Sequence, residues 1–456
     1  MKRCLEDLRK ALGGKKVSAR VKDLQAHSGD KWFASHLPEV VVFPEKTEDV
    51  SKVMQIATRH GVPVTARGAG YGYVGGCVPV RGGIALSLAR MNKIREISVE
   101  DAVAVVQPGV KTVKVQEAAR KKKLFYPPDP ASLKDSSIGG NIATNAGGPR
   151  CLKYGVTRSF VLGLEVVLAD GRVAHIGGRT VKNKTGFDLV GLLVGSEGML
   201  GVVTEATLRL LPYPPARSAV VATFAAAKDA ARCVLEIQKA GILPAALEVA
   251  DAFSLEAARN FKKGFPPGDA FVLVEVDGQR ETVGVEKKRL VNLFWSLKAM
   301  EVREADGDEG CERLWDLRRA MSESLKATGL KKLNEDIAVP RSRVVDLFEF
   351  AAKLQKESGF PVACFGHAGD GNIHVNIMVP KDALADEKKQ EAVLDKLFVQ
   401  ILKWKGVLTG EHGIGLAKKR WWKQAASPVV QDLHLAIKHA LDPKGLLNPG
   451  KFLDPL

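Results

Sequence analysis

The chain has 456 residues, of which 45% are apolar and 26% are charged. These proportions are ordinary for a soluble globular protein, and the length excludes one compact core, so we expect two domains. Lys and Arg exceed Asp and Glu by 16, but the basic residues are scattered and only 6% of the chain is aromatic, which argues against a nucleic-acid-binding surface and favours a solvated basic one.

The six cysteines lie far apart, without the short paired spacing of a disulfide framework or a zinc ribbon, which favours a reducing compartment. The N-terminus becomes charged again too soon for a signal peptide, and the longest mostly apolar stretch, residues 160–169, is too short to span a bilayer. We therefore expect a cytoplasmic protein without a transmembrane segment. Peripheral attachment to the inner face of the membrane through a partner is the alternative.

Apolar patterning predicts a helical, polar segment over residues 1–35 and then a half rich in short strands and glycine. Strands are expected at residues 40–43, 62–65, 84–88 and 103–107, with helices at 47–59 and 113–122.

The proline-rich segment 211–216 predicts a domain boundary. Beyond it, strands are expected at residues 219–224, 245–249, 270–276, 337–339 and 361–365. Amphipathic helices such as 225–239 and 342–355 separate them, which predicts an α+β sheet covered by helices. We expect domains at residues 1–211 and 212–427, and a C-terminal tail at 428–456 that returns to the first domain.

Glycine is concentrated in three segments of the first domain. The first runs from Arg67 to Gly76 and follows an expected strand. Backbone N–H groups without intervening Cβ atoms form a concave anion site that suits a pyrophosphate. The spacing is not that of a Rossmann fingerprint, and the Gly-Lys-Ser/Thr of a Walker loop is absent from the sequence.

The second segment, residues 136–148, contains small residues and short polar side chains and comes shortly after Pro128 and Asp129. Such a composition is expected where backbone amides and hydroxyls line a large flat ligand. The third segment, residues 195–205, leads into another strand.

In this order, and over residues 40–211, the three segments resemble the FAD-binding domain of the vanillyl-alcohol oxidase/p-cresol methylhydroxylase type. The resemblance implies a domain of two subdomains, in which the first loop wraps the pyrophosphate and the other two segments line the adenosine and the isoalloxazine. Members with covalent flavin often have a histidine where this chain has Tyr71, so we expect non-covalent FAD. The residues that we assign to the cofactor are Arg67, Gly68, Ala69, Gly70, Tyr71, Gly72, Pro128, Asp129, Ser132, Gly139, Gly140, Asn145, Glu197, Gly201, Val202, Val203 and Asn448.

Two motifs of the second half contain three of the nine histidines: His367 to His374, with Gly-Asp-Gly-Asn between them, and the glycine-flanked pair Glu411-His412. The turn residues can fold two strands back so that both imidazoles converge. Two histidine nitrogens and one carboxylate oxygen form a common open site for zinc or a similar divalent ion. Such an ion could chelate a 2-hydroxy acid and lower the pKa of its hydroxyl, with His412 as general base. The alternative is that these histidines only cap turns.

These motifs resemble the C-terminal domain of FAD-linked oxidases, a family that includes the flavoprotein subunit of glycolate oxidase and the D-lactate and D-2-hydroxyglutarate dehydrogenases. The resemblance covers nearly the whole chain and implies an α+β substrate domain with an antiparallel sheet. It implies that His367, His374 and Glu411 hold the metal, zinc first and manganese or iron as alternatives, and that His412 is the catalytic base. It further implies that Arg318 binds the substrate carboxylate, with Ser322 as a helper and Asn376 facing the site.

Relatives that act on dicarboxylates carry a lysine where this chain has Asn334, which favours D-lactate or glycolate over D-2-hydroxyglutarate. We therefore expect FAD-dependent oxidation of a small D-2-hydroxy acid to the 2-oxo acid, by metal-assisted proton abstraction and hydride transfer to flavin N5. The alternatives are a D-2-hydroxyglutarate dehydrogenase, a flavoenzyme similar to alkyl-glycerone-phosphate synthase, and a non-enzymatic binding module. The sequence has no cysteine pattern for an iron–sulfur cluster, so an external electron acceptor is expected, with an iron–sulfur partner subunit as one candidate and a homodimer as one assembly.

Overall fold

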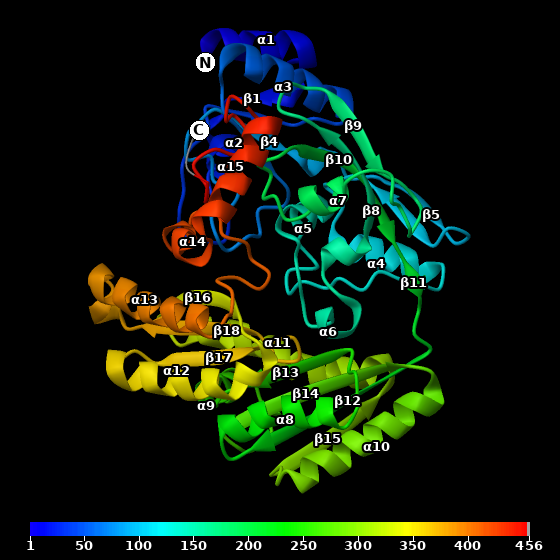
Figure 1. Ribbon diagram of the computed structural model, residues 1–456, viewed down its shortest axis with the longest axis vertical. Helices are drawn as coiled ribbons and strands as arrows, with labels where there is room; N and C mark the ends of the chain where they lie inside the picture. Colours follow the sequence, from blue (N-terminus) through cyan, green and yellow to red (C-terminus); the bar gives the residue numbers. More distant parts are fainter. Residues whose placement is uncertain (454–456) are drawn as a thin grey trace. The chain divides into compact units, whose positions relative to one another are not determined.

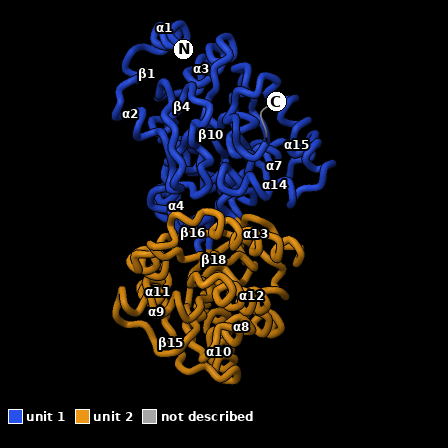
Figure 2. The backbone as a smooth tube through the Cα atoms, turned by 90° about the vertical axis from the view of Figure 1, so that its left-hand side faces the viewer, with its two compact units in different colours: residues 1–148, 155–213, 411–456 blue, residues 149–154, 214–410 orange. Residues whose placement is uncertain are grey.

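The structure, a computed structural model, describes residues 1–453. The chain forms two compact units (Figure 2). Unit 1 comprises residues 1–148, residues 155–213 and the chain from Glu411 onward, and unit 2 comprises residues 149–154 and 214–410. The chain therefore passes from one unit to the other four times, after residues 148, 154, 213 and 410.

The first sheet of unit 1 has the strand order β1-β2-β4-β3, with β2, β4 and β3 parallel. Strand β2 is buried at every residue, as expected for a parallel strand covered on both faces. Helix α3 buries Val50, Val53, Met54 and Ala57, which share one helical face, and ends at Gly61 in the left-handed conformation. The elements are α1 (Lys2–Leu12), β1 (Val17–Ser18), α2 (Val21–Ala26), β2 (Val40–Val42), α3 (Thr47–His60), β3 (Val64–Arg67) and β4 (Ile84–Ser87).

The second sheet of unit 1 is antiparallel, with the strand order β5-β6-β10-β8-β9. Figure 1 labels four of these strands, β5, β8, β9 and β10. Along its central strand β10, buried and partly exposed residues alternate, so one face packs against the core. Its strands are β5 (Ile94–Ser98), β6 (Val103–Val106), β8 (Val161–Val167), β9 (Val173–Gly177) and β10 (Val202–Arg209).

The remaining elements of unit 1 are short or lie at the C-terminal end. A small pair joins β7 to β11, and the segment after α15 pairs with β3 through Val64 and Leu447. These elements are α4 (Thr112–Lys121), β7 (Leu124–Phe125), α5 (Ile138–Thr144), α7 (Leu189–Leu193), β11 (Leu211–Pro212), α14 (Lys419–Ala425) and α15 (Pro428–Leu441).

Unit 2 is built on one antiparallel sheet of seven strands in the order β15-β12-β14-β13-β17-β18-β16. Helices α9 and α11 pack on one face with Ala219 and Val221 of β12, and α10 lies on the other, where Phe224 contacts Phe294. The strands are β12 (Ala216–Phe224), β13 (Ala246–Ala250), β14 (Ala270–Gly278), β15 (Glu301–Asp306), β16 (Lys331–Ala338), β17 (Val362–His367) and β18 (Asn372–Val379). The helices are α6 (Cys151–Tyr154), α8 (Ala227–Lys239), α9 (Ala252–Phe261), α10 (Arg280–Ser296), α11 (Gly307–Ala327), α12 (Val344–Ser358) and α13 (Glu387–Lys403). The expected α+β architecture, with an antiparallel sheet covered by helices, is confirmed.

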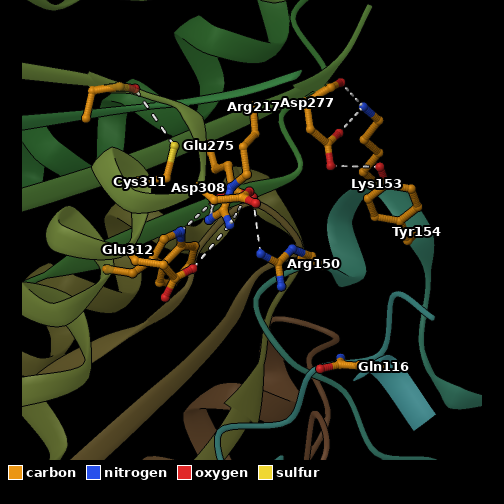
Figure 3. A network of polar contacts seen from close by, with 12 residues as sticks. Gln116, Arg150, Lys153, Tyr154, Arg217, Glu275, Asp277, Asp308, Cys311 and Glu312 are labelled. Carbon is orange, nitrogen blue, oxygen red and sulfur yellow. Dashed lines mark hydrogen bonds and ion pairs between the residues drawn. The ribbon is translucent and has the colours of Figure 1, made fainter. Parts of the chain in front are cut away.

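Residues 149–154 are fastened to the sheet of unit 2 by two buried carboxylates of β14 (Figure 3). Glu275 forms ion pairs with Arg150, at 3.3 Å, and with Arg217, at 2.6 Å, and it accepts a hydrogen bond from the indole N–H of Trp315 at 2.6 Å. Asp277 pairs with Lys153 and accepts the hydroxyl of Tyr154. Paired buried charges hold a segment firmly, because removing one partner leaves the other uncompensated.

The N-terminal segment departs from the sequence prediction. Within residues 1–35, helical structure is limited to α1, α2 and the 3₁₀ turn Gly14–Lys16, because α1 ends before Gly13 and residues 17 and 18 pair as β1 with β2. Residues 411–427, expected in the second domain, lie in unit 1, where Leu416 and Ala417 donate backbone hydrogen bonds to Val74. Within residues 1–453, the helices lack the combination of length and apolar composition that crossing a membrane requires.

Candidate functional site

The first and second glycine segments pack against each other in unit 1. Ser137 caps the N-terminus of α5, and its hydroxyl accepts hydrogen bonds from the backbone N–H groups of Ala69, at 3.1 Å, and Gly140, at 3.3 Å. A Cβ atom at Gly68 would collide with the same hydroxyl, and Gly70 has a φ of +73°. At Gly68 and Gly70 the absence of a Cβ atom thus leaves backbone N–H groups accessible to an anionic ligand.

Other residues predicted to bind the cofactor lie within the second segment or shortly before it. A Cβ atom at Gly139 would lie 2.6 Å from Pro108, and one at Gly148 would lie 2.6 Å from the carbonyl of Asp129. Asn145 ends α5 with a φ of +51° and accepts the backbone N–H of Arg158. Pro128 accepts a hydrogen bond from Gln116, and Ser132 accepts backbone N–H groups of the turn that follows.

Some predicted residues have partners within the protein. The Arg67 guanidinium donates to the carbonyl of Gly29 and contacts Cys77. Tyr71 lies under the ammonium of Lys31, Val202 is part of the core between the sheets, and Gly201 packs against Val166. Gly72 lies beside Asp30, whereas Val203 pairs with Val166 in the β10–β8 ladder.

Asn448 connects the C-terminal tail to the first and third glycine segments. Its amide nitrogen donates to the carbonyls of Gly76, at 2.9 Å, and Glu197, at 2.7 Å. Its amide oxygen is buried and has no hydrogen-bond partner in the described part of the chain. A buried polar atom of this kind ordinarily has a partner, so a ligand with a donor group fits here. The residues present therefore fit FAD.

The loop that carries Glu411 and His412 is held by Glu197. Both oxygens of this buried carboxylate accept backbone N–H groups, from Ile414 at 2.8 Å and from Gly415 at 2.9 Å. Burial raises the pKa of Glu197, and the two N–H donors and Lys451 oppose that rise. The imidazole of His412 is stacked on the ring of Tyr73, a residue of the first glycine segment that our site prediction omitted.

The predicted metal ligands lie together. One ligand atom from each of His367, His374 and Glu411 falls within 4.8 Å of the others, and the two imidazole centroids are 5.5 Å apart. The turn between β17 and β18 brings the histidines close. Glu411 follows directly on Gly410, whose N–H donates to Asp336 of β16 at 2.9 Å. Two imidazoles and one carboxylate are a common donor set for zinc and similar ions, so these residues fit a divalent metal.

Two acidic residues that our site prediction omitted support this cluster. Glu248 of β13 accepts from Nδ1 of His367 at 2.6 Å and from Nε of Arg318 at 2.7 Å. Burial alone raises the pKa of Glu248, but His367 and Arg318 together lower it to about 2. Asp336 accepts from Asn372 at 2.6 Å and from Thr409 at 2.9 Å, and lies 3.8 Å from Nδ1 of His374. Glu248 is an acid in a largely apolar strand, and buried acids are rare unless they are paired, which is the sequence feature that could have revealed it.

The predicted substrate residues lie on the sheet and helix beside the cluster. The Arg318 guanidinium of α11 lies 4.7 Å from the ring centroid of Phe365, and Ser322 follows one helical turn later. Asn376 is fully buried and donates to the carbonyls of Ala363 and His374. Its amide oxygen has no hydrogen-bond partner within residues 1–453, which leaves an acceptor beside His374.

Comparison with known proteins reveals extensive similarity. The family model "FAD linked oxidases, C-terminal domain" matches residues 213–452, and the model "FAD binding domain" matches residues 38–177. The glycolate oxidase subunit GlcD of Bacillus subtilis (strain 168) is 38% identical over 417 residues, covering 91% of this chain and 89% of that protein. A D-lactate dehydrogenase of Anaerostipes hadrus is 34% identical, with coverages of 91% and 89%. A structure of p-cresol methylhydroxylase with bound substrate superposes with a TM-score of 0.81 at 20% identity, covering 99% of this chain and 96% of that one, which shows a shared fold.

Proposed function

The chain belongs to the FAD-linked oxidases, and on this premise we propose that it oxidises a small D-2-hydroxy acid, D-lactate or glycolate, to the 2-oxo acid. The observation that carries the proposal is the cluster of His367, His374 and Glu411 in a protein that also has Arg318 joined to the cluster through Glu248. A cation-binding donor set and a guanidinium are complementary to the hydroxyl and the carboxylate of such an acid. The names of the glycolate and D-lactate relatives support the same substrate class.

Different residues of the chain would bind the substrate carboxylate and remove the hydroxyl proton. Glu248 engages Nε of Arg318, so the two Nη groups remain to grip a planar carboxylate. His412, next to Glu411 in the chain, would accept the hydroxyl proton. When bound, FAD supplies a hydride acceptor at N5, and a divalent metal, zinc first and manganese or iron as alternatives, supplies a Lewis acid that acidifies the hydroxyl.

The substrate is proposed to be small because neutral amides occupy the strand positions beside His374. Asn334 pairs with Asn376 across β16 and β18, and the amide oxygens of both are buried without a hydrogen-bond partner among the described residues. Uncharged acceptors suit a substrate without a second carboxylate, because burying a carboxylate without a cationic partner is costly.

A second candidate substrate, D-2-hydroxyglutarate, is favoured by Lys332. This residue lies two positions before Asn334 on β16, and side chains two apart share a face of the sheet. Burial and Lys326 lower the pKa of Lys332 to about 8, and its ammonium forms no ion pair with an acid in the described chain. Such a cation could receive a distal carboxylate.

We place the electron acceptor on a partner, with an iron–sulfur subunit as the first candidate, because the Bacillus relative is named as a subunit of an oxidase. A cytoplasmic location, attachment to the membrane through that partner and a homodimer stay predictions.

The test is anaerobic mixing of the purified holoprotein with achiral glycolate, with D-lactate and D-2-hydroxyglutarate, and with the L-enantiomers of the last two acids. We expect D-lactate or glycolate to bleach the flavin and the L-acids to leave it oxidised. His412→Ala should abolish the bleaching, whereas the control His439→Ala, on the exposed side of α15, should not change it. Bleaching of the His412 variant at the parent rate would refute the base assignment, and a flavin that no 2-hydroxy acid reduces would refute the function.

A further inference from the structure

The carboxylate of Glu248 joins two residues that the proposed function uses separately. Its Oε1 lies 2.6 Å from Nδ1 of His367, and its Oε2 lies 2.7 Å from Nε of Arg318. Glu248 is 0% exposed, and both partners are at least nine-tenths buried. The contact is therefore a continuous buried bridge within unit 2, from a predicted metal ligand to the predicted carboxylate anchor.

Strand pairing fixes one end of this bridge. In the antiparallel ladder of β13 and β17, Val249 pairs with Gly366 and Ala250 with Phe365, and the next position brings Glu248 opposite His367. The imidazole donates Nδ1–H to the carboxylate, so Nε2 is the nitrogen left to bind a metal. A carboxylate in this position fixes the tautomer and orientation of a ligating histidine and raises its basicity.

Packing fixes the other end. The Arg318 guanidinium is held by Glu248 at Nε and lies over the ring of Phe365, which pairs directly with His374 in the β17–β18 ladder. His367 and His374 thus lie on β17 and β18, and Arg318 of α11 contacts side chains of β13 and β17. The separation between the guanidinium and the imidazoles is therefore set by strand pairing and helix packing and not by a flexible loop.

We propose that Glu248 is a positioning residue for the oxidation of 2-hydroxy acids. It holds His367 and Arg318 at a fixed separation, so that an acid whose carboxylate is bound by Arg318 has its C2 hydroxyl presented to the metal ligands. Glu248 itself contacts neither the substrate nor the flavin. This role rests on the proposed function and adds to it a residue that acts on metal binding and on substrate binding together.

If Glu248 bridges the two residues, its substitution should impair metal binding and substrate binding together. Glu248→Gln keeps the size of the side chain but loses its charge, so that one amide must face both an imidazole N–H and a guanidinium. Loss of such an outer-shell partner weakens metal affinity roughly 10–100-fold, and we expect KM for the acid to rise by about the same factor while kcat falls less. Glu248→Asp keeps the charge at a shorter reach and should recover part of both properties.

The matched control is Glu275→Gln, which removes another buried carboxylate with arginine partners from the neighbouring strand β14. It should lower the melting temperature while metal affinity and KM stay within about twofold of the parent, since Glu275 has no contact with the cluster. Metal affinity is measured by titrating zinc, in competition with a chromophoric chelator, into metal-depleted FAD-loaded protein. KM is measured with the acid that reduces the flavin.

The outcomes separate the positioning role from the function. If Glu248→Gln lowers thermal stability but keeps zinc affinity and KM within twofold of the parent, Glu248 is only structural and the proposal is overturned. If the parent binds zinc but no 2-hydroxy acid reduces its flavin, the proposed function fails while a zinc defect in Glu248→Gln still supports the His367 half of the bridge. If the parent binds no divalent metal, the His367 half of the proposal is overturned. If KM of Glu248→Gln also equals that of the parent, the Arg318 half is overturned as well.

Discussion

The ring of Tyr73 lies stacked on the imidazole of His412, with the centroids 5.3 Å apart and the planes inclined by 28°. Tyr73 belongs to the first glycine segment, and the next residue, Val74, accepts backbone hydrogen bonds from Leu416 and Ala417 of the His412 loop. The segment proposed to hold the flavin phosphates therefore also orients the proposed base, although the two are more than three hundred residues apart in the sequence.

Removing the Tyr73 ring should slow the reaction more than it disturbs FAD binding. An aromatic pair contributes about 0.5–1.5 kcal/mol, so Tyr73→Ala is expected to lower kcat by about threefold to tenfold by freeing the imidazole. Tyr73→Phe keeps the ring and should stay near the parent. Bound flavin per chain and the rate of anaerobic reduction are the two readouts, and equal loss of both in Tyr73→Ala would contradict this role.

Glu197→Gln should loosen the same loop from the other side. Its carboxylate accepts two backbone N–H groups, whereas an amide has only one oxygen, so a buried donor loses its partner at a cost of about 1–3 kcal/mol. The control is Glu205→Gln, which lies half-buried on β10 and is expected to change stability by no more than about 0.5 kcal/mol. Chemical denaturation of both variants checks the prediction, which fails if the two shifts are equal.

Glu275 should make unit 2 sensitive to acid. Burial alone raises its pKa, but Arg150 and Arg217 outweigh burial and lower the pKa below the ordinary value of 4.5. Because the folded pKa is depressed, the stabilisation is present above the unfolded pKa and is lost as the pH falls through the folded pKa. The melting temperature should therefore drop below about pH 4, and less steeply in Glu275→Gln than in the parent.

The cost of Glu275→Gln at neutral pH is expected to be about 3–5 kcal/mol, because two partly buried arginines lose the buried carboxylate that both of them contact. Glu312→Gln is the matched control, since Glu312 contacts the same Arg217 at 3.1 Å but is about half exposed. It should cost no more than about 1 kcal/mol. Differential scanning calorimetry at several pH values measures both, and parallel pH profiles for parent and Glu275→Gln would disprove the assignment.

Gly68→Ala should impair FAD binding. The added Cβ collides with the Ser137 hydroxyl, which caps α5 and holds Ala69, so the two glycine segments must separate. Overpacking of about 1–3 kcal/mol would weaken FAD affinity by roughly tenfold or more. Gly76→Ala, in the same segment, meets only Val74 at an ordinary 3.8 Å and should retain FAD. Flavin content after gel filtration decides between them.

Sequence patterns located the elements well where the chain is locally regular. The helix expected at residues 47–59 is α3 (Thr47–His60), and the strand expected at 40–43 is β2 (Val40–Val42). Strand β16 was expected only at residues 337–339 but spans Lys331–Ala338. Its polar residues, Lys332 and Asn334 among them, interrupt the apolar pattern that identifies a strand. They share a face with Asp336, which lies 3.8 Å from Nδ1 of His374.

The candidate site was predictable to the extent that its residues are neighbours in sequence. Gly-Asp-Gly-Asn indicated a turn between His367 and His374, and the structure brings the imidazoles together. Glu248 could not be found this way, because its partners Arg318 and His367 are 70 and 119 residues away and meet it only through strand register and helix packing. Pairing between distant strands depends on the whole sheet and leaves no local pattern.

The four passages of the chain between the units limit how this protein can be dissected. A fragment of residues 214–410 would lack Arg150 and Lys153, two cations that neutralise carboxylates in its sheet, and the complementary N-terminal fragment would lack the His412 loop that Glu197 holds. Chimaeras that exchange only the contiguous middle segment with a relative would therefore combine a hexapeptide from one parent with a sheet from the other. A chimaera that exchanges unit 2 between relatives must therefore take residues 149–154 and residues 214–410 from the same parent.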